Sequence, residues 1–152
     1  QMSLAEKINI DVKNALKAGD KKLLAVSRNV LSELKNLLIK ENLERDISKI
    51  TNDSFQKVIK TIVKQKNETK DYLIQVKDHE KIEIINYDLG YLEAFLPKYL
   101  NDKDTENLVK KYITEKSLEK KDFGKLMGIL KSNHSDEIDL SLASKIVNTL
   151  LN

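Results

Sequence analysis

The chain of 152 residues has no cysteine, no tryptophan and a single proline. Without cysteine there can be no disulfide and no thiolate nucleophile or ligand. No apolar run approaches the roughly 20 residues that a membrane-spanning helix needs. The N-terminal segment has neither a hydrophobic signal core nor an Arg/Ser-rich amphipathic presequence, which predicts a cytoplasmic protein. Gln1 before Met2 leaves a mitochondrial or plastid location open, if a presequence was removed.

Residues that break helices are also scarce, because the chain contains four glycines besides the one proline. Leucine, isoleucine, lysine and glutamate are abundant, and all of them are compatible with helix. No segment alternates between apolar and polar residues for long enough to indicate a strand. The sequence therefore predicts an all-α fold.

The single proline, Pro97, predicts the main division of the chain. Its ring removes a backbone donor and disfavours helical angles at Leu96, so a helix must end near Phe95. Apolar residues flank the break on both sides, which favours a packed joint over a loose linker. We expect a larger helical domain with long antiparallel helices in residues 1–96 and a small three-helix domain in residues 97–152.

Apolar periodicity and capping residues predict seven helices. In the first domain they run between the caps Ser3 and Gly19, from Asp20 to about Ile39, from Thr51 or Asp53 to Tyr72–Val76, and from about Lys81 to Phe95. In the second domain they begin at Asp104 or Thr105, at Asp122, and at Asp139 or Ser141.

Signatures of a self-sufficient active site are missing from the sequence. His79 and His134 lie far apart, and neither has a second histidine or a cysteine at ligand spacing, so no metal site is predicted. There is no glycine-rich phosphate loop, and the serine–lysine pair Ser32 and Lys35 has no accompanying oxyanion loop. The sequence indicates no catalytic residue and no cofactor.

Gly124 and Gly128 are four residues apart and share one face of an expected helix. Each costs about 1 kcal/mol relative to alanine inside a helix, so the pair calls for a reason. Glycine permits close approach of another backbone, either a neighbouring helix, which we expect first, or a nucleic-acid strand. Lys125 and Lys131 flank this surface and keep the second interpretation open.

The basic residues are almost all lysine, since Arg28 and Arg45 are the only arginines, and the net charge is only +3. Lysine attracts phosphate diffusely and does not read base edges as arginine does. Two groups have helical spacing: Arg28 and Lys35 in the second helix, and Lys57, Lys60 and Lys64 in the third. Each group is either a solvated helix face or a phosphate-binding surface.

Four segments together resemble the GatB/YqeY domain family in order and spacing: Val26–Asn36, Lys64–Thr69, Tyr91–Leu100 and Asp122–Gly128. The most specific part is the Leu96-Pro97 joint followed by Asp-x-Gly-Lys-x-Met from Asp122. The resemblance implies a larger helical domain followed by a three-helix tail. The same module ends the B subunit of the glutamine-dependent amidotransferase that converts mischarged Glu-tRNA or Asp-tRNA. There it contacts tRNA, and other domains perform the transfer.

The resemblance implies a tRNA-binding or accessory module related to carbon–nitrogen ligases that use glutamine as amido donor, without autonomous activity. The implied partners are tRNA, an amidotransferase or an aminoacyl-tRNA synthetase. Within the family motifs, basic residues match at Arg28 and Lys35, and the tail motif matches at Gly124, Lys125 and Gly128. The residues that we expect to bind nucleic acid are Arg28, Lys35, Lys57, Lys60, Lys64 and Lys125.

Two departures from the family pattern predict weaker tRNA affinity. Lys77-Asp78 stands where the family commonly has a Gly-Arg turn, and residues 133–139 are acidic where it has a basic loop with glycine. The alternative function is a protein-interaction adaptor without nucleic-acid binding, using an apolar groove between the domains near Phe95, Tyr99 and Tyr112. An autonomous enzyme is the third hypothesis.

Overall fold

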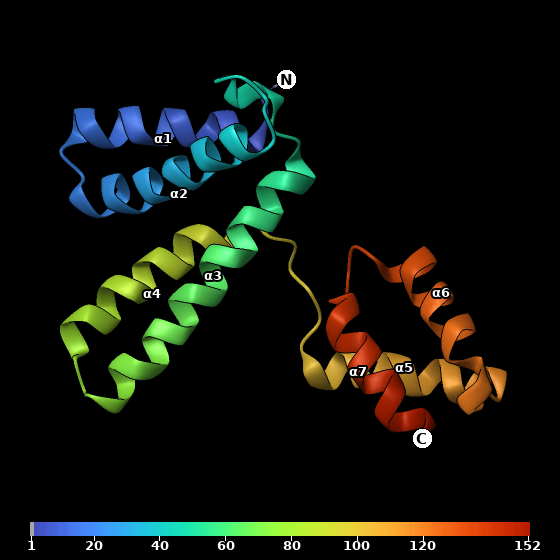
Figure 1. Ribbon diagram of the computed structural model, residues 1–152. Helices are drawn as coiled ribbons and strands as arrows, with labels where there is room; N and C mark the ends of the chain where they lie inside the picture. The colour runs from blue at the N-terminus through green and yellow to red at the C-terminus, as the bar shows by residue number, and fades with distance from the viewer. Residues whose placement is uncertain (1) are drawn as a thin grey trace. The chain divides into compact units, whose positions relative to one another are not determined.

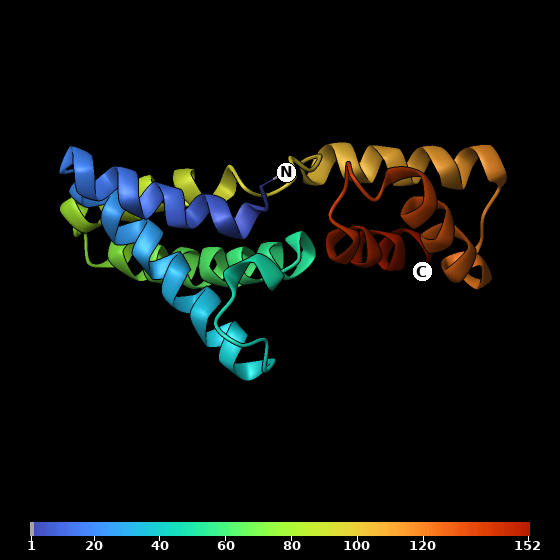
Figure 2. The same cartoon turned by 90° about the horizontal axis from the view of Figure 1, so that it is seen from above.

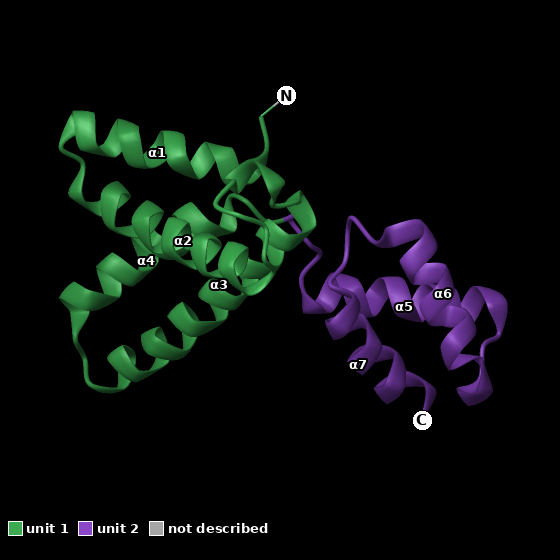
Figure 3. Cartoon of the chain, turned by 45° about the horizontal axis from the view of Figure 1, so that its top comes forward, with its two compact units in different colours: residues 1–96 green, residues 97–152 purple. Residues whose placement is uncertain are grey.

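The computed structural model describes residues 2–152, and this part of the chain contains seven α-helices, two short 3₁₀ helices and no strand (Figure 1). The prediction of an all-α fold is confirmed. The chain divides into two compact units, residues 1–96 and 97–152 (Figure 3). Each unit has a hydrophobic core of its own.

The first unit contains four α-helices and the second contains three. The first comprises α1 (Leu4–Ala18), α2 (Lys21–Lys40), the 3₁₀ helix η1 (Ile47–Lys49), α3 (Asn52–Gln75) and α4 (His79–Glu93). The second comprises α5 (Asp102–Lys116), the 3₁₀ helix η2 (Lys120–Asp122), α6 (Phe123–His134) and α7 (Leu140–Leu151).

Local side chains set most helix starts where the sequence predicts them. Ser3 and Glu6 form a capping box at α1, and the Asp20 carboxylate accepts from the Leu23 N–H at 3.1 Å to start α2. Thr51 caps α3 in the same way. Gly19 ends α1 in the left-handed conformation, with φ 67°.

The predicted start of α5 is wrong by two to three residues. The helix begins at Asp102, because Asn101 caps it by accepting from the Asp104 N–H at 2.7 Å. Thr105 is buried inside the first turn, where its hydroxyl donates to the Asn101 carbonyl at 2.8 Å. Asp102 and Asp104 lie in the first turn, where the helix dipole favours negative charge.

The first unit is built from two helical hairpins, α1–α2 and α3–α4, stacked on each other (Figure 1). From above, α2 crosses α3 obliquely, and its C-terminal end extends beyond α3 (Figure 2). Fully buried side chains from the helices form the core between them: Ile8, Val30, Leu34, Phe55, Ile59 and Leu92. In the last turn of α2, Ile39 and Lys40 are exposed, and so are most residues of the segment that follows.

The chain ahead of Pro97 closes the core of the first unit. α4 ends at Glu93, close to the predicted end, and Leu96 packs against the core. The Phe95 ring contacts Phe55 edge-on, with 5.3 Å between ring centroids.

The second unit packs α5, α6 and α7 around Val109, Leu126, Leu130 and Val147. The segment before α5 is held to the segment between α6 and α7 by a hydrogen bond, in which the Leu100 N–H donates to the Glu137 carbonyl at 2.7 Å.

Candidate functional site

One exposed side of α2 carries only positive charge. Lys21, Arg28 and Lys35 are exposed and follow each other at intervals of seven residues, nearly two helical turns, so they form one row along the helix. Neighbours in this α2 row are about 10 Å apart along the axis at 1.5 Å rise per residue. Glu33 is the one carboxylate of α2, and it lies two residues from Lys35, on a different side of the helix.

The carboxylates of the α1–α2 hairpin do not neutralise this row, because most of them have other partners. Glu6 and Asp20 cap the starts of α1 and α2. Asp11 accepts a hydrogen bond from the Tyr91 hydroxyl at 2.6 Å. Burial, and secondly this hydrogen bond, raises the pKa of Tyr91 far above its ordinary value, so the phenol keeps its proton and donates it to Asp11.

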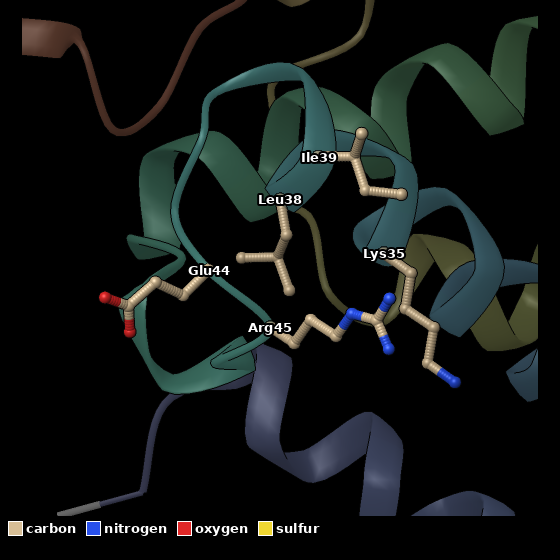
Figure 4. A pocket seen from close by; sticks show the side chains of 5 residues that line it. All are labelled: Lys35, Leu38, Ile39, Glu44 and Arg45. Carbon is tan, nitrogen blue, oxygen red and sulfur yellow. The ribbon is translucent and has the colours of Figure 1, made fainter.

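A pocket of about 250 Å³ lies at the C-terminal end of the α2 row. Its lining residues are Lys35, Leu38, Ile39, Glu44 and Arg45 (Figure 4). The Arg45 guanidinium points toward the Lys35 side chain, whereas the Glu44 carboxylate points away from both. Glu44 instead pairs with Lys49, with 3.6 Å between Nζ and Oε2. Two cations from different segments therefore meet at one pocket.

The sequence reasoning missed Lys21 and Arg45. Lys21 could have been predicted from spacing, because it precedes Arg28 by the same seven residues that separate Arg28 from Lys35. Arg45 had no periodic signal, since it lies in the irregular segment between α2 and η1. Its position depends on how that segment folds back on α2, which spacing does not reveal.

The predicted α3 lysines form a second, separate group. Lys57, Lys60 and Lys64 are exposed on α3, and Lys57 lines a groove of about 290 Å³ together with Lys40 and Glu41 from the end of α2.

This groove also contains Leu37, two residues and about 200° around the helix from Lys35. Lys57 therefore meets α2 on a different side from the α2 row. Asp53 and Glu68 precede Lys57 and follow Lys64 by four residues on the same side of α3, which brackets these lysines with negative charge.

Most of the predicted binding residues take part in none of the ion pairs found in the described residues. Among residues 2–152, the ion pairs with nitrogen and oxygen within 4.0 Å do not include Arg28, Lys35, Lys57, Lys64 or Lys125. The most buried ion pair joins Lys66 to Asp88 at 3.1 Å and supports the α3–α4 hairpin.

The expectation that Gly124 and Gly128 allow close helix packing is wrong. Both glycines are exposed, and a Cβ atom at either position would meet no other atom within 4 Å. The physical reason is that α6 packs through Leu126 and Leu130, so the glycines lie on its outer face beside exposed Lys125. Packing within the second unit therefore does not explain why two glycines, which each destabilise a helix relative to alanine, stand at these positions.

Two of the three aromatic residues of the adaptor hypothesis, Phe95 and Tyr112, have contacts inside their own units. Phe95 packs edge-on against Phe55 and Tyr91, at 5.3 Å from each. The Tyr112 hydroxyl is 2.7 Å from Nε2 of His134. Tyr99 is half-buried.

Two kinds of site are missing from the part of the chain that the structure describes. No group of three or more His, Cys, Asp or Glu side chains there could hold a metal ion. In the same residues, no helix combines the length and apolar character needed to cross a membrane. His134 lies half-buried between Tyr112 and Glu137, with 3.3 Å between its Nδ1 and Oε1 of Glu137.

Comparison with protein families identifies the chain over almost its full length. The family model described as YqeY-like protein matches residues 5–151. The chain belongs to the YqeY-like protein family. The match spans both units of this YqeY-like chain and confirms the resemblance drawn from its motifs at the level of that family. A search of curated proteins found no match to the sequence.

Proposed function

We propose that this YqeY-like chain is a tRNA-binding or accessory module associated with glutamine-dependent tRNA amidotransfer, without catalytic activity of its own. The observation that carries the proposal is the α2 row with Arg45 at its end: four cations on one accessible side, outside every ion pair found in residues 2–152. The association with amidotransfer rests on the resemblance to the GatB/YqeY domain.

Binding would be electrostatic docking on the phosphate backbone. The α2 row extends about 21 Å from Lys21 to Lys35 at 1.5 Å per residue, so it suits a run of phosphates better than a single anion. Lysine and arginine contacts to phosphates position a nucleic acid without reading its sequence. The module would therefore recognise the backbone and shape of a folded RNA.

The α3 lysines and Lys125 are secondary contacts in this proposal. Lys57, Lys60 and Lys64 are bracketed by Asp53 and Glu68, which weakens the local attraction for phosphate. Lys125 lies in the second unit, beside the exposed glycines of α6.

Two double variants with the same change in net charge test which surface binds. Arg28→Glu with Lys35→Glu is expected to lower the affinity for folded tRNA by about tenfold or more at fixed low salt, because two phosphate contacts become repulsive. Lys57→Glu with Lys64→Glu serves as the matched control and should have a clearly smaller effect. Unchanged affinity in the first variant would overturn the α2 row as the binding surface, and a larger loss in the second would move it to α3.

The proposal also assigns the transfer chemistry to a partner. The purified chain should not amidate mischarged Glu-tRNA with glutamine as donor, and product formed by the chain alone would establish it as an enzyme. Partners to test are an amidotransferase and an aminoacyl-tRNA synthetase.

A protein-interaction adaptor is the second candidate, supported by a different surface. Tyr72 in the last turn of α3 and Val76, its C-cap, are exposed at 61% and 50% and lie four residues apart, on one side of the helix end. Capture of partners from a nuclease-treated lysate separates the two functions, because an adaptor keeps its partner when RNA is destroyed. Loss of that partner in a Tyr72→Ser, Val76→Ser variant would assign the contact to this surface.

A further inference from the structure

We propose that the pocket between Lys35 and Arg45 takes one unpaired nucleotide of the bound RNA, with the phosphate between the two cations and the base against Leu38 and Ile39. The inference rests on the proposed function for the source of the nucleotide. It goes beyond that function because it names a position where the protein distinguishes an unpaired residue from duplex.

The charge at the pocket fits one phosphate. Arg45 offers a planar fork of donors that matches phosphate oxygens, and Lys35 adds a compact point charge from α2 (Figure 4). Glu44 also lines the pocket, but its carboxylate points away and pairs with Lys49 at 3.6 Å. Two cations that face one space repel each other, and an anion between them removes that cost.

The apolar part of the pocket fits a flat ring. Leu38 is buried at 3% exposure, and the adjacent Ile39 is 74% exposed, the largest value among the exposed large hydrophobic residues. Core packing therefore does not use Ile39. Proteins that bind unpaired nucleotides place bases against apolar or guanidinium surfaces, and Arg45 supplies a guanidinium plane in addition to Ile39.

The size of the pocket limits the occupant to one residue of RNA. Its volume of about 250 Å³ lies below the range of roughly 300–1,000 Å³ that is typical of pockets for drug-sized ligands. A base pair does not fit, and a base within a duplex is stacked on both faces. An unpaired nucleotide in a loop or at an end is small enough for the pocket, and its base has a free face.

The backbone around Arg45 is held in an uncommon conformation. Asn42 and Glu44 both have left-handed φ values, 56° and 57°. Asn42 ends α2, as the Leu43 N–H donates to the Leu38 carbonyl at 3.0 Å. Glu44 has no such role, and a non-glycine residue there stores strain directly before Arg45. Strain of this kind persists where surrounding contacts fix the chain, so the direction of Arg45 is specified.

Titration of the full chain with AMP, adenosine and inorganic phosphate, followed by NMR, tests the pocket without any RNA. AMP is expected to shift the resonances of Lys35, Leu38, Ile39 and Arg45, and to bind about tenfold more tightly than either fragment, because only AMP uses both halves of the pocket. Phosphate binding as tightly as AMP would reduce the site to a plain anion site and overturn the proposal. So would the absence of shifts at these residues.

Single variants separate the two halves of the pocket. Ile39→Ser should weaken AMP binding about fivefold and leave phosphate binding unchanged, since its side chain is exposed and contacts only the base. Arg45→Gln should weaken both by about tenfold. Arg28→Gln, on the same helix and outside the pocket, is the matched control and should leave AMP binding intact while weakening tRNA binding. An Ile39→Ser variant that binds AMP normally contradicts the placement of the base.

Competition connects the pocket to RNA and distinguishes its failure from failure of the proposed function. Folded tRNA should displace AMP, and a blunt RNA duplex should not. Salt-dependent tRNA binding that leaves AMP in place would overturn the pocket and spare the proposed function. AMP binding without any tRNA binding would contradict the proposed function and also overturn RNA as the source of the nucleotide.

Discussion

At the scale of single residues, several helix ends depend on left-handed backbone conformations. Gly19 adopts one with φ 67°, without the cost that a side chain brings there. Lys77, with φ 58°, occupies the equivalent position after α3, where the Asp78 N–H donates to the Leu73 carbonyl at 3.0 Å. A positive φ is a conformation that glycine adopts without cost and that lysine adopts only under strain.

Lys77→Gly is therefore expected to raise the free energy of unfolding by about 1 kcal/mol, because glycine removes the left-handed strain at an exposed site. Urea denaturation monitored by circular dichroism measures the change. Gly19→Ala is the matched control and should lower stability by a similar amount. A destabilising Lys77→Gly would show that the lysine side chain contributes more than its backbone costs.

The Tyr91–Asp11 hydrogen bond predicts a dependence of stability on alkaline pH. The pKa of Tyr91 in the folded chain is raised above its ordinary value of 10.0, so the stabilisation is complete below pH 10.0. Above pH 10.0 the unfolded chain releases a proton that the folded chain keeps, and stability falls.

Tyr91→Phe should be less stable near neutral pH and should lose less stability between pH 9 and pH 11 than the natural chain. Thermal unfolding across this range provides the measurement. Tyr72→Phe, at an exposed site, is the control and should follow the natural chain. Identical pH profiles for the natural chain and Tyr91→Phe would rule out this linkage.

At the scale of helices, the sequence predicts starts and ends well where one residue acts locally. Ser3, Asp20 and Thr51 cap helices as expected, since a cap needs only contacts within one turn. The start of α5 was missed because Asn101-Asp-Lys-Asp-Thr105 offers several capping side chains in succession, and spacing does not choose between them.

The orientation of a helix face is harder to predict, as α6 shows. Spacing places Gly124 and Gly128 on one face, but the partners of Leu126 and Leu130 decide whether that face is buried. The structure turns it outward, where alanine would fit.

Gly124→Ala and Gly128→Ala should each raise the stability of the second unit by about 1 kcal/mol, because both positions are helical, exposed and unobstructed. Gly90→Ala in α4 is the matched control, with the same open surroundings in the first unit. If an RNA backbone approaches α6 closely, the two α6 variants will weaken tRNA binding and Gly90→Ala will not. Lower thermal stability of either α6 variant would contradict the conclusion that this face of α6 is exposed and unobstructed.

At the scale of the whole chain, the net charge is small, but basic and acidic residues are concentrated in different helices. The net charge is +3, yet the Leu4–Lys40 hairpin contains eight basic and four acidic residues, whereas α4 contains one lysine and four acidic residues. The sequence predicted Arg28 and Lys35 as one group because they share a helix. It could not show that Arg45 joins them or that Lys57 faces another side of α2, since both depend on how the chain packs.

The measurement that tests the central claim most directly is the affinity of the intact chain for folded tRNA as a function of salt. Docking through the α2 row and Arg45 predicts a linear fall of log affinity with log salt, with a slope of about −3, since four neutralised phosphates contribute roughly −0.7 to −0.9 each. The Arg28→Glu, Lys35→Glu variant should reduce that slope. Absence of binding at low salt, or an affinity that does not change with salt, would contradict the account.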